Sequence, residues 1–379
     1  MRRKYNLIKS KRLDYELYFL RNGVKPITIK DIARESGVST ATVSYVINGS
    51  RSVTPEKRQR VLDVVSKTNY QPDRVAKSLR TKKTNIIGVL AEDILNFPTV
   101  GIINGISEYI EKTDYNILLN DLRMLDSLFN KYDQIIHQKD KINKALSFLI
   151  FGAKVDAVIY VGMFDRDISG IVTDVNKPVV IAYSTASDKH AFSVTYENES
   201  AAADVTRHLI TGGHKRIAVI TGLTHTAPAQ MRLKGIIKAF KEAGLILDSA
   251  LVRNGDWERT SGYECMKDIL KTERDDLPTA VIAMNDLMAV GAMDAIKQAS
   301  LRVPDDISVV GFDNREVSEF VFPMLTTVEI DLKAIGYTAA QMATQKLSGT
   351  GEYADTRSII IPSKLLMRGT LINNKEVSH

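Results

Sequence analysis

The sequence predicts an α/β protein: a small helical headpiece followed by a larger region of parallel sheets. Between residues 27 and 70, apolar residues recur at helical spacing in three short stretches. From residue 85 onward, short apolar stretches alternate with amphipathic helical ones. Strands that alternate with helices form parallel sheets with right-handed crossovers. This region is too long for one small sheet, so we expect two α/β lobes.

The headpiece shows start and stop signals for three helices. Thr28, with Asp31 in the following turn, is an N-cap that begins the first helix, and Gly37 ends it because glycine tolerates a left-handed backbone. Ser39 caps a second helix, and Thr54 followed by proline begins a third. The tight turn between the first two helices predicts a helix-turn-helix arrangement.

The remaining elements follow in chain order. Residues 71–84 form a basic linker with one or two helical turns, capped by Asp73. Buried strands are expected at residues 86–90, 117–119, 157–161, 179–181, 217–220, 280–282 and 309–312, and helices at residues 100–112, 200–211, 230–243 and 286–299. Residues 121–155 are long for a single helical crossover, which predicts an insertion or an extended helix there.

Composition excludes several classes of protein. No apolar stretch reaches the roughly 18 residues of a membrane span, and the basic start of the chain leads into no secretory signal. The single cysteine, Cys265, cannot form an internal disulfide, and the six histidines share no metal-ligand spacing. We therefore expect no disulfide framework, no bound metal and no cofactor.

The charge is divided unevenly along the chain. Residues 1–84 hold 20 Lys and Arg against 7 Asp and Glu, a balance of +13, whereas the remaining 295 residues have a balance of −7. A basic end on a mildly acidic body suits a protein that presents that end to a polyanion. A solvated lysine-rich tail is the alternative that composition alone leaves open.

The second headpiece helix carries the residues that point to DNA. In a helix-turn-helix this helix enters the major groove, so its outer face needs short polar side chains. That face is expected to hold Ser39, Thr40, Ala41, Thr42, Ser44, Tyr45 and Asn48, while Val43, Val46 and Ile47 face inward. The alternative is a three-helix module that contacts other proteins.

The run from Ile27 to Gly49 closely resembles the headpiece of the lactose/galactose repressor family of bacterial transcription regulators. Its residues 31–48 carry the pattern D-I-A-x-x-S-G-V-S-x-x-T-V-S-x-V-I-N. The resemblance continues through residues 72–79, 213–217, 285–286, 309–313 and 361–370, and so covers roughly residues 26–370. It implies an N-terminal extension at 1–25, a headpiece at 26–70, a hinge helix and linker at 71–84, and a periplasmic-binding-protein-like core at 85–379. The lobes of this core would comprise residues 85–190 with 331–350 and residues 191–328 with 355–370.

The resemblance also implies how DNA is bound. The residues that would contact phosphates are Thr28, Ser39, Thr42, Ser44, Asn48 and Thr54. The residues that would contact base edges are Thr40, Ala41 and Tyr45. In the hinge, Leu79 would wedge between base pairs in the minor groove with Ala76 close by. Phosphates would be attracted by Arg74, Lys77, Lys82 and Lys83. An ordinary buried leucine is the alternative for Leu79.

By the same resemblance, a small-molecule effector binds between the two lobes, where the strands end. The residues at the matching positions are Phe97, Pro98, Tyr183, Arg232, Trp257, Asn285 and Asp313. Arg232 offers a planar fork to paired hydroxyls, Asp313 accepts from hydroxyls, and Trp257 would cover the apolar face of a sugar ring. Tyr183 replaces an acid that several sugar-binding relatives use, so no particular sugar is implied. The alternatives are a structural ion pair between Arg232 and Asp313 and a surface-packed Trp257.

Together these implications describe a cytoplasmic, homodimeric repressor whose binding to a near-palindromic double-stranded operator is controlled by a sugar-like effector. The sign of the response stays open, because purine-type members bind DNA better with ligand. A regulator with a phosphoprotein co-effector is a second possibility. An enzyme is not expected, since the sequence has no G-x-x-x-x-G-K-[ST], G-x-S-x-G or H-E-x-x-H motif. No leucine heptad follows residue 370, so a tetramer built by the tail is not expected.

Overall fold

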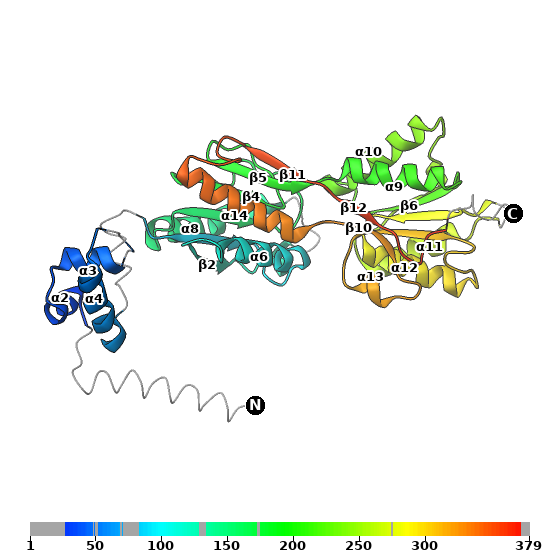
Figure 1. The fold of residues 1–379 in the computed structure, drawn as a ribbon. Helices are drawn as coiled ribbons and strands as arrows, with labels where there is room; N and C mark the ends of the chain where they lie inside the picture. Colours follow the sequence, from blue (N-terminus) through cyan, green and yellow to red (C-terminus); the bar gives the residue numbers. More distant parts are fainter. Residues whose placement is uncertain are drawn as a thin grey trace, which may run out of the picture. The chain divides into compact units, whose positions relative to one another are not determined.

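The computed structural model describes residues 27–47, 49, 52–68, 70, 83–128, 134–172, 175–273 and 276–372, and the chain divides into two compact units, 1–84 and 85–379 (Figure 1). Several predictions lie outside the described residues: those on the extension 1–25 and on Asn48, Asp73, Arg74, Ala76, Lys77, Leu79 and Lys82. Among the described residues, no helix is long and apolar enough to cross a membrane.

The first unit contains the three predicted headpiece helices. These are α2 (Ile29–Ser36), α3 (Thr40–Ile47) and α4 (Pro55–Thr68). The backbone N–H of Thr28 donates to Asp31 Oδ2 at 3.0 Å, and Gly37 ends α2 with a φ of 65°. The N–H of Thr42 donates to Ser39 Oγ at 3.1 Å, which is the expected cap of α3. The helices enclose a small core of Ile32, Ala33, Val43, Val46 and Val61.

The second unit begins with a parallel sheet, which we call the first lobe. Its strand order is β11-β5-β4-β3-β1-β2. The strands are β1 (Ile86–Ala91), β2 (Asn116–Asp121), β3 (Ala157–Val161), β4 (Val179–Ala182), β5 (Ala191–Tyr196) and β11 (Ser358–Ile361). The adjacent helices α6 (Phe97–Ile110) and α14 (Leu332–Ser348) pack against each other (Figure 1).

The second lobe repeats this architecture with strand order β12-β10-β9-β8-β6-β7, parallel except for the β10–β12 pair. Its strands are β6 (Ile217–Thr221), β7 (Val252–Asn254), β8 (Ala280–Ala283), β9 (Ser308–Asp313), β10 (Thr326–Glu329) and β12 (Lys364–Leu366). Its helices are α9 (Glu199–Thr211), α10 (Ala227–Glu242), α11 (Arg259–Ile269), α12 (Asp286–Gln298) and α13 (Val317–Phe320), with a short 3-10 turn η3 (Ser249–Leu251).

The lobe boundaries differ from the sequence expectation. Residues 191–196 were expected in the second lobe, but they form β5 of the first sheet, and residues 358–361 join the same sheet as β11. Ser193 and Thr195 interrupt the apolar pattern of β5, which is why the strand gave no buried-strand signal. The chain therefore passes between lobes after β5, after β10 and after β11.

Residues 121–155 form a series of helical pieces in place of a single crossover helix. They include α7 (Leu125–Leu128), a 3-10 helix η1 (Gln134–Gln138), α8 (Lys139–Ser147) and a π-helical turn η2 (Phe148–Gly152). Residues 129–133 are outside the described part. The predicted extra length is thus used to cover one face of the first sheet with apolar side chains such as Ile135, Ile142 and Leu149.

Glycines let paired helices approach backbone to backbone. A Cβ on Gly105 of α6 would lie 1.9 Å from the Lys333 carbonyl oxygen on α14, and one on Gly336 would lie 1.9 Å from the Ile102 carbonyl oxygen. In the second lobe, a Cβ on Gly291 of α12 would lie 2.0 Å from the Arg259 carbonyl oxygen of α11. These contacts fix the distance between the helices that cover each sheet.

Candidate functional site

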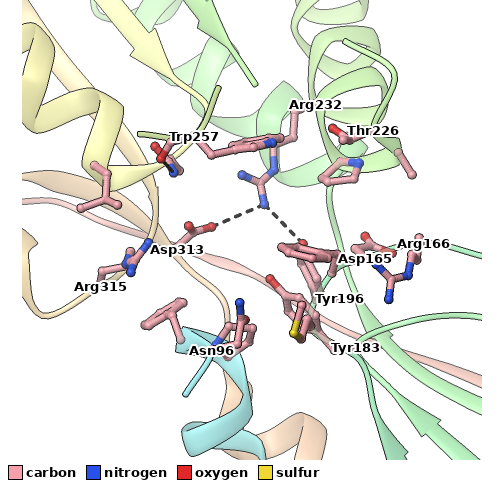
Figure 2. A pocket seen from close by; sticks show the side chains of 18 of the residues that line it. Asn96, Asp165, Arg166, Tyr183, Tyr196, Thr226, Arg232, Trp257, Asp313 and Arg315 are labelled. Atoms are coloured by element: carbon pink, nitrogen blue, oxygen red, sulfur yellow. Dashed lines mark hydrogen bonds and ion pairs between the residues drawn. The ribbon is translucent and has the colours of Figure 1, made fainter. Parts of the chain in front are cut away.

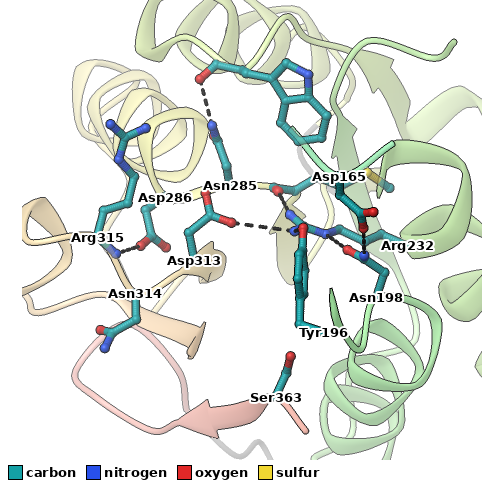
Figure 3. A network of polar contacts seen from close by, with 12 residues as sticks. Asp165, Tyr196, Asn198, Arg232, Asn285, Asp286, Asp313, Asn314, Arg315 and Ser363 are labelled. Carbon is teal, nitrogen blue, oxygen red and sulfur yellow. Dashed lines mark hydrogen bonds and ion pairs between the residues drawn. The ribbon is translucent and has the colours of Figure 1, made fainter. Parts of the chain in front are cut away.

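A buried arginine is the centre of the cleft between the lobes. Arg232, on the first turns of α10, is 2% exposed. Its Nε donates to Asn198 Oδ1 at 2.8 Å, and its terminal nitrogens donate to the Met284 carbonyl and to the Tyr196 hydroxyl. The second terminal nitrogen also lies 3.5 Å from Asp313 Oδ1 (Figure 3). The contacts to Tyr196, at 3.4 Å, and to Asp313 are the longest of the four.

Asn198 connects this arginine to a second carboxyl group. Its Nδ2 donates to Asp165 Oδ2 at 2.6 Å while its Oδ1 accepts from Arg232. Burial raises the pKa of Asp165 to about 6, although the Arg232 charge and the Asn198 hydrogen bond oppose that rise. Burial also raises the pKa of Asp313, against the opposing charges of Arg232 and Arg315. The cleft thus presents two carboxyl groups to one arginine.

The Asp165 pKa gives a testable pH dependence. In the unfolded chain this carboxyl titrates near 3.9, so between pH 4 and 6 the native state holds a proton that the unfolded state has lost. Asp165 therefore contributes stability at low pH that disappears as the pH rises through 6. Relative to Asp165→Asn, the wild type should lose about 1 kcal/mol of unfolding free energy between about pH 5 and pH 7.5, measured by urea denaturation without ligand. Parallel pH profiles for the two proteins would contradict this assignment.

The second lobe reaches across the cleft through Arg315. Its guanidinium lies 4.6 Å from the ring centroid of Phe97, at the start of α6 in the first lobe. Its backbone N–H donates to Asp286 Oδ2 at 2.6 Å, and Thr327 Oγ1 donates to the other oxygen at 2.5 Å. Burial and the neighbouring Asp313 raise the pKa of Asp286 to about 8. Asp286 therefore holds the turn after β9 in place through the Arg315 backbone (Figure 3).

Arg232, Asp165, Asp313 and Arg315 line one cavity of about 570 Å³. All the sequence-predicted effector residues line it: Phe97, Pro98, Tyr183, Arg232, Trp257, Asn285 and Asp313. Of these, Figure 2 labels Tyr183, Arg232, Trp257 and Asp313. They come from both lobes and from turns that follow the strands, as expected for a site at the carboxyl ends of parallel strands. The volume lies within the range of about 300–1,000 Å³ typical of ligand pockets.

Three of the cavity residues have strained backbones. The φ angles are 71° at Tyr183, 77° at Trp257 and 103° at Asp313, in a region that non-glycine residues rarely adopt. Tyr183 follows β4 directly, Trp257 follows β7 closely, and Asp313 is the last residue of β9. Strain of this kind gathers at functional sites because the surrounding structure must hold a side chain in one direction. The strain therefore supports a binding role for this cavity.

Trp257 and Asn285 are fixed by local contacts. The Trp257 indole lies so close over Gly222 that a Cβ there would come within 2.0 Å of the ring. Asn285 Nδ2 donates to the Trp257 carbonyl at 2.7 Å, and Asn285 Oδ1 accepts from the Met288 N–H at 2.8 Å as the cap of α12. Asn285 thus positions Trp257 and α12 in addition to lining the cavity.

Sequence reasoning missed Asp165, Tyr196 and Asn198. Tyr196 stacks on Tyr183 with ring centroids 5.0 Å apart, and it ends β5, a strand that the sequence did not reveal. Asp165 lies shortly after β3, where an acid after a predicted strand is a usable signal. Nearby, Arg166 forms a buried ion pair with Glu92 at 2.6 Å, and Glu92 also accepts from the Tyr160 hydroxyl.

The headpiece presents the predicted face of α3. Thr40, Ala41 and Tyr45 are exposed, whereas Val43 and Val46 are buried. Ser39 and Thr42 are joined at the helix start by a 2.9 Å hydrogen bond between their hydroxyls. The other predicted contact residues in the described part, Thr28, Ser44, Thr54 and Lys83, are exposed or half-buried.

Comparisons with known proteins agree with this architecture. Residues 28–73 match the model of bacterial regulatory proteins of the lacI family, and residues 206–371 match that of the periplasmic binding protein-like domain. The chain is 33% identical over 351 residues to catabolite control protein A of Priestia megaterium, covering 90% of this chain and 98% of that protein. It is 33% identical over 335 residues to the HTH-type transcriptional repressor PurR of Pasteurella multocida (strain Pm70), covering 88% and 95%.

A solved structure shows the same fold over nearly the whole chain. The crystal structure of the lac repressor dimer bound to operator and the anti-inducer ONPF superimposes with a TM-score of 0.71 at 26% identity, covering 92% of this chain and all of that one. The resemblance that the headpiece motif indicated is therefore confirmed. The chain belongs to the lacI family of bacterial regulatory proteins, which are DNA-binding transcription regulators.

Proposed function

We propose that this regulator reads its operator with the outer face of α3. The observation that carries the proposal is the exposure of Thr40, Ala41 and Tyr45 above a buried apolar face. Short side chains at the first two positions let the helix lie deep in the major groove, and Tyr45 reaches further. The residues assigned to phosphates are Thr28, Ser39, Thr42, Ser44, Asn48, Thr54, Arg74 and Lys77, with Leu79 and Ala76 assigned to the minor groove.

The core, on this proposal, binds a sugar or a related polyol in the cleft around Arg232. An arginine fork donates to neighbouring hydroxyls, Asp313 and Asp165 accept from them, and an aromatic ring such as Trp257 covers the apolar face of the ring. The similar lac repressor was solved with operator and an anti-inducer, which supports two kinds of ligand on one chain. The ligand acts as an effector that is released unchanged, and the protein works on DNA in the bacterial cytoplasm.

The coupling follows from the three passages of the chain between the lobes, after β5, β10 and β11. A ligand that contacts Arg232 in the second lobe and Tyr183 in the first binds most tightly when the lobes are closed. It shifts the protein toward that state only by its differential affinity for the closed and open forms. The change of lobe angle then alters DNA binding through the hinge.

Dimerisation is assigned to an exposed apolar patch around α13. Phe320 is 77% exposed and Phe322 97%, and Met324 adjoins them. The Gly369 N–H donates to the Met324 carbonyl at 2.9 Å, which places Met367 beside the same patch. Contiguous exposed apolar groups of this kind mark protein interfaces. A second copy of the chain is the partner that a near-palindromic operator requires.

Phe322→Asp should therefore convert the dimer to a monomer at micromolar concentration, because it places a charge within an apolar contact. Light scattering after gel filtration measures the mass. Ile246→Asp is the matched control, since Ile246 is 91% exposed and belongs to the segment that follows α10. A Phe322→Asp protein that stays dimeric would refute this surface.

The function as a whole is tested in two steps. Selection of binding sites from random duplex DNA should yield a near-palindromic sequence, bound less tightly as salt rises. A thermal-shift screen of sugars and polyols should then yield a ligand that raises the melting temperature and changes operator affinity. Failure to select any sequence contradicts the DNA assignment, and a screen without a hit contradicts the effector class.

A further inference from the structure

A carboxylate lies buried behind the wall of the cavity. Glu92, directly after β1, is fully buried and does not itself line the cavity. Within the described part of the chain it accepts three hydrogen bonds: from the Met163 N–H at 2.9 Å, from the Tyr160 hydroxyl, and from Arg166 Nη2 at 2.6 Å. Glu92 thus joins the end of β1 to the loop after β3 without reaching the ligand space.

The charge of Glu92 is balanced by Arg166. Burial and the neighbouring Glu92 raise the pKa of Tyr160, so the phenol keeps its proton and donates as a neutral group. Arg166 is therefore the charged donor among the three. A buried charge is costly unless it is paired and hydrogen-bonded. The 2.6 Å ion pair makes Glu92 and Arg166 counter-ions of each other.

Arg166 has a second face, which belongs to the cavity. Its side chain is 10% exposed and lines the cavity beside Asp165 (Figure 2). Both neighbouring carboxylates have other donors, because Asp165 accepts from the Asn198 amide and Asp167 accepts from the Ser169 hydroxyl. The charge that Arg166 brings to the cavity wall is therefore balanced from behind, by Glu92.

An arginine in a cavity wall attracts anions, since a guanidinium forms bidentate hydrogen bonds with carboxylate and phosphate groups. The other two arginines of the cavity are also opposed by a carboxyl group. Asp313 lies 3.5 Å from Arg232, and the positive charge of Arg315 acts on the same carboxyl. A negatively charged ligand would compete with these carboxylates for each guanidinium. Selectivity arises in this way when the wrong ligand is disfavoured.

We propose that Glu92 is a positioning residue that sets the charge selectivity of the cavity: by pairing with Arg166 from behind, it makes the site accept uncharged ligands and reject anionic ones. The rejected class comprises uronates, sugar phosphates and free phosphate. This inference rests on the proposed effector site and adds the charge of the ligand to its chemistry.

The first test uses inorganic phosphate and needs no identified effector. Glu92→Gln keeps the length of the side chain and removes its charge, so Arg166 loses its counter-ion at the cavity wall. Thermal melts of the full-length protein compare phosphate with chloride at equal ionic strength. At about 10 mM, phosphate should raise the melting temperature of Glu92→Gln by about 2 °C or more beyond the wild-type response. The comparison with the wild type cancels phosphate binding elsewhere on the chain.

Two further variants separate charge from packing. Glu92→Asp keeps the negative charge on a shorter side chain, and Glu92→Gln combined with Arg166→Gln removes both charges, so both proteins should respond to phosphate like the wild type. Removing one partner of a buried ion pair is strongly destabilising, and the double variant keeps the test decisive if Glu92→Gln does not fold. A wild type that gains more from phosphate than the double variant overturns the proposal. So does a folded Glu92→Gln protein that gains no more than the wild type.

The second test titrates sugars and their uronates calorimetrically: glucose against glucuronate, and galactose against galacturonate. The wild type should bind the neutral member of a pair at least about tenfold more tightly, and Glu92→Gln should lower that ratio about tenfold, the worth of one charge-assisted hydrogen bond. Equal wild-type affinity for both members overturns the charge selectivity. If neither pair binds, the proposed effector class fails, whereas the phosphate comparison still decides the role of Glu92.

Discussion

Arg232→Met should abolish effector binding while the protein still binds its operator. Methionine keeps an unbranched apolar side chain but removes all five donors of the guanidinium, whose carbon lies 3.9 Å from the ring centroid of Phe312. Each hydrogen bond from a charged donor is worth about 1.5–3 kcal/mol. Because about 1.4 kcal/mol corresponds to a tenfold change in affinity, the loss of two such bonds to the ligand weakens binding on the order of 100-fold or more.

The same substitution has a stability cost that must be separated from binding. Removing one partner from a buried ion pair costs about 3 kcal/mol or more, since Asp313 is left without its cation. Lys234→Met is the matched control, because Lys234 lies on the same helix and makes an exposed ion pair with Glu199 at 2.7 Å. Calorimetric titration and denaturant melts are measured on both variants. If Arg232→Met bound the ligand within about threefold of the wild-type affinity, the change in binding free energy would be small. Arg232 would then serve only as a structural ion pair.

Ala41→Glu should abolish specific operator binding without unfolding the headpiece. Ala41 is exposed on the first turn of α3, where a carboxylate interacts favourably with the helix dipole. In the major groove the glutamate side chain occupies more space than the alanine methyl group, and its charge is repelled by the negative charge of DNA. We expect operator affinity to fall on the order of 100-fold, equivalent to losing one or two good base contacts.

Electrophoretic mobility shift at fixed salt measures this loss, because phosphate attraction varies steeply with salt. Ala243→Glu makes the same change at an exposed position of the second unit, outside the headpiece, and should leave operator binding unaltered. Circular dichroism of the Ala41→Glu protein should match the wild type. Unchanged operator affinity would show that α3 does not enter the groove.

The sequence predicted well the features that depend on short-range spacing. The order of exposed and buried residues on α3 follows from helical periodicity within eight residues, and strands such as β3 and β4 are unbroken apolar runs. β5 was missed because Ser193 and Thr195 alternate with its apolar residues, and with it Tyr196 was missed.

The site could be predicted only where a motif or a resemblance named its residues. Arg232 and Asp313 were expected on that ground, and they do lie 3.5 Å apart. Asn198 could not be expected, because its role depends on two partners, Asp165 and Arg232, that lie 33 and 34 positions away. The positive φ angles at Tyr183 and Trp257 likewise arise from the packing of turns and leave no trace in local composition.

The position of β11 and β12 near the end of the described chain affects the order in which its parts fold during synthesis. Each forms an edge of its sheet, and both lie within residues 358–366. Neither sheet is complete until the ribosome has released this segment, whereas the headpiece helices end at residue 68. Because domains fold in the order in which they emerge, the part that reads DNA folds long before the part that controls it. A polypeptide cut short before residue 358 carries an intact headpiece and two unfinished sheets.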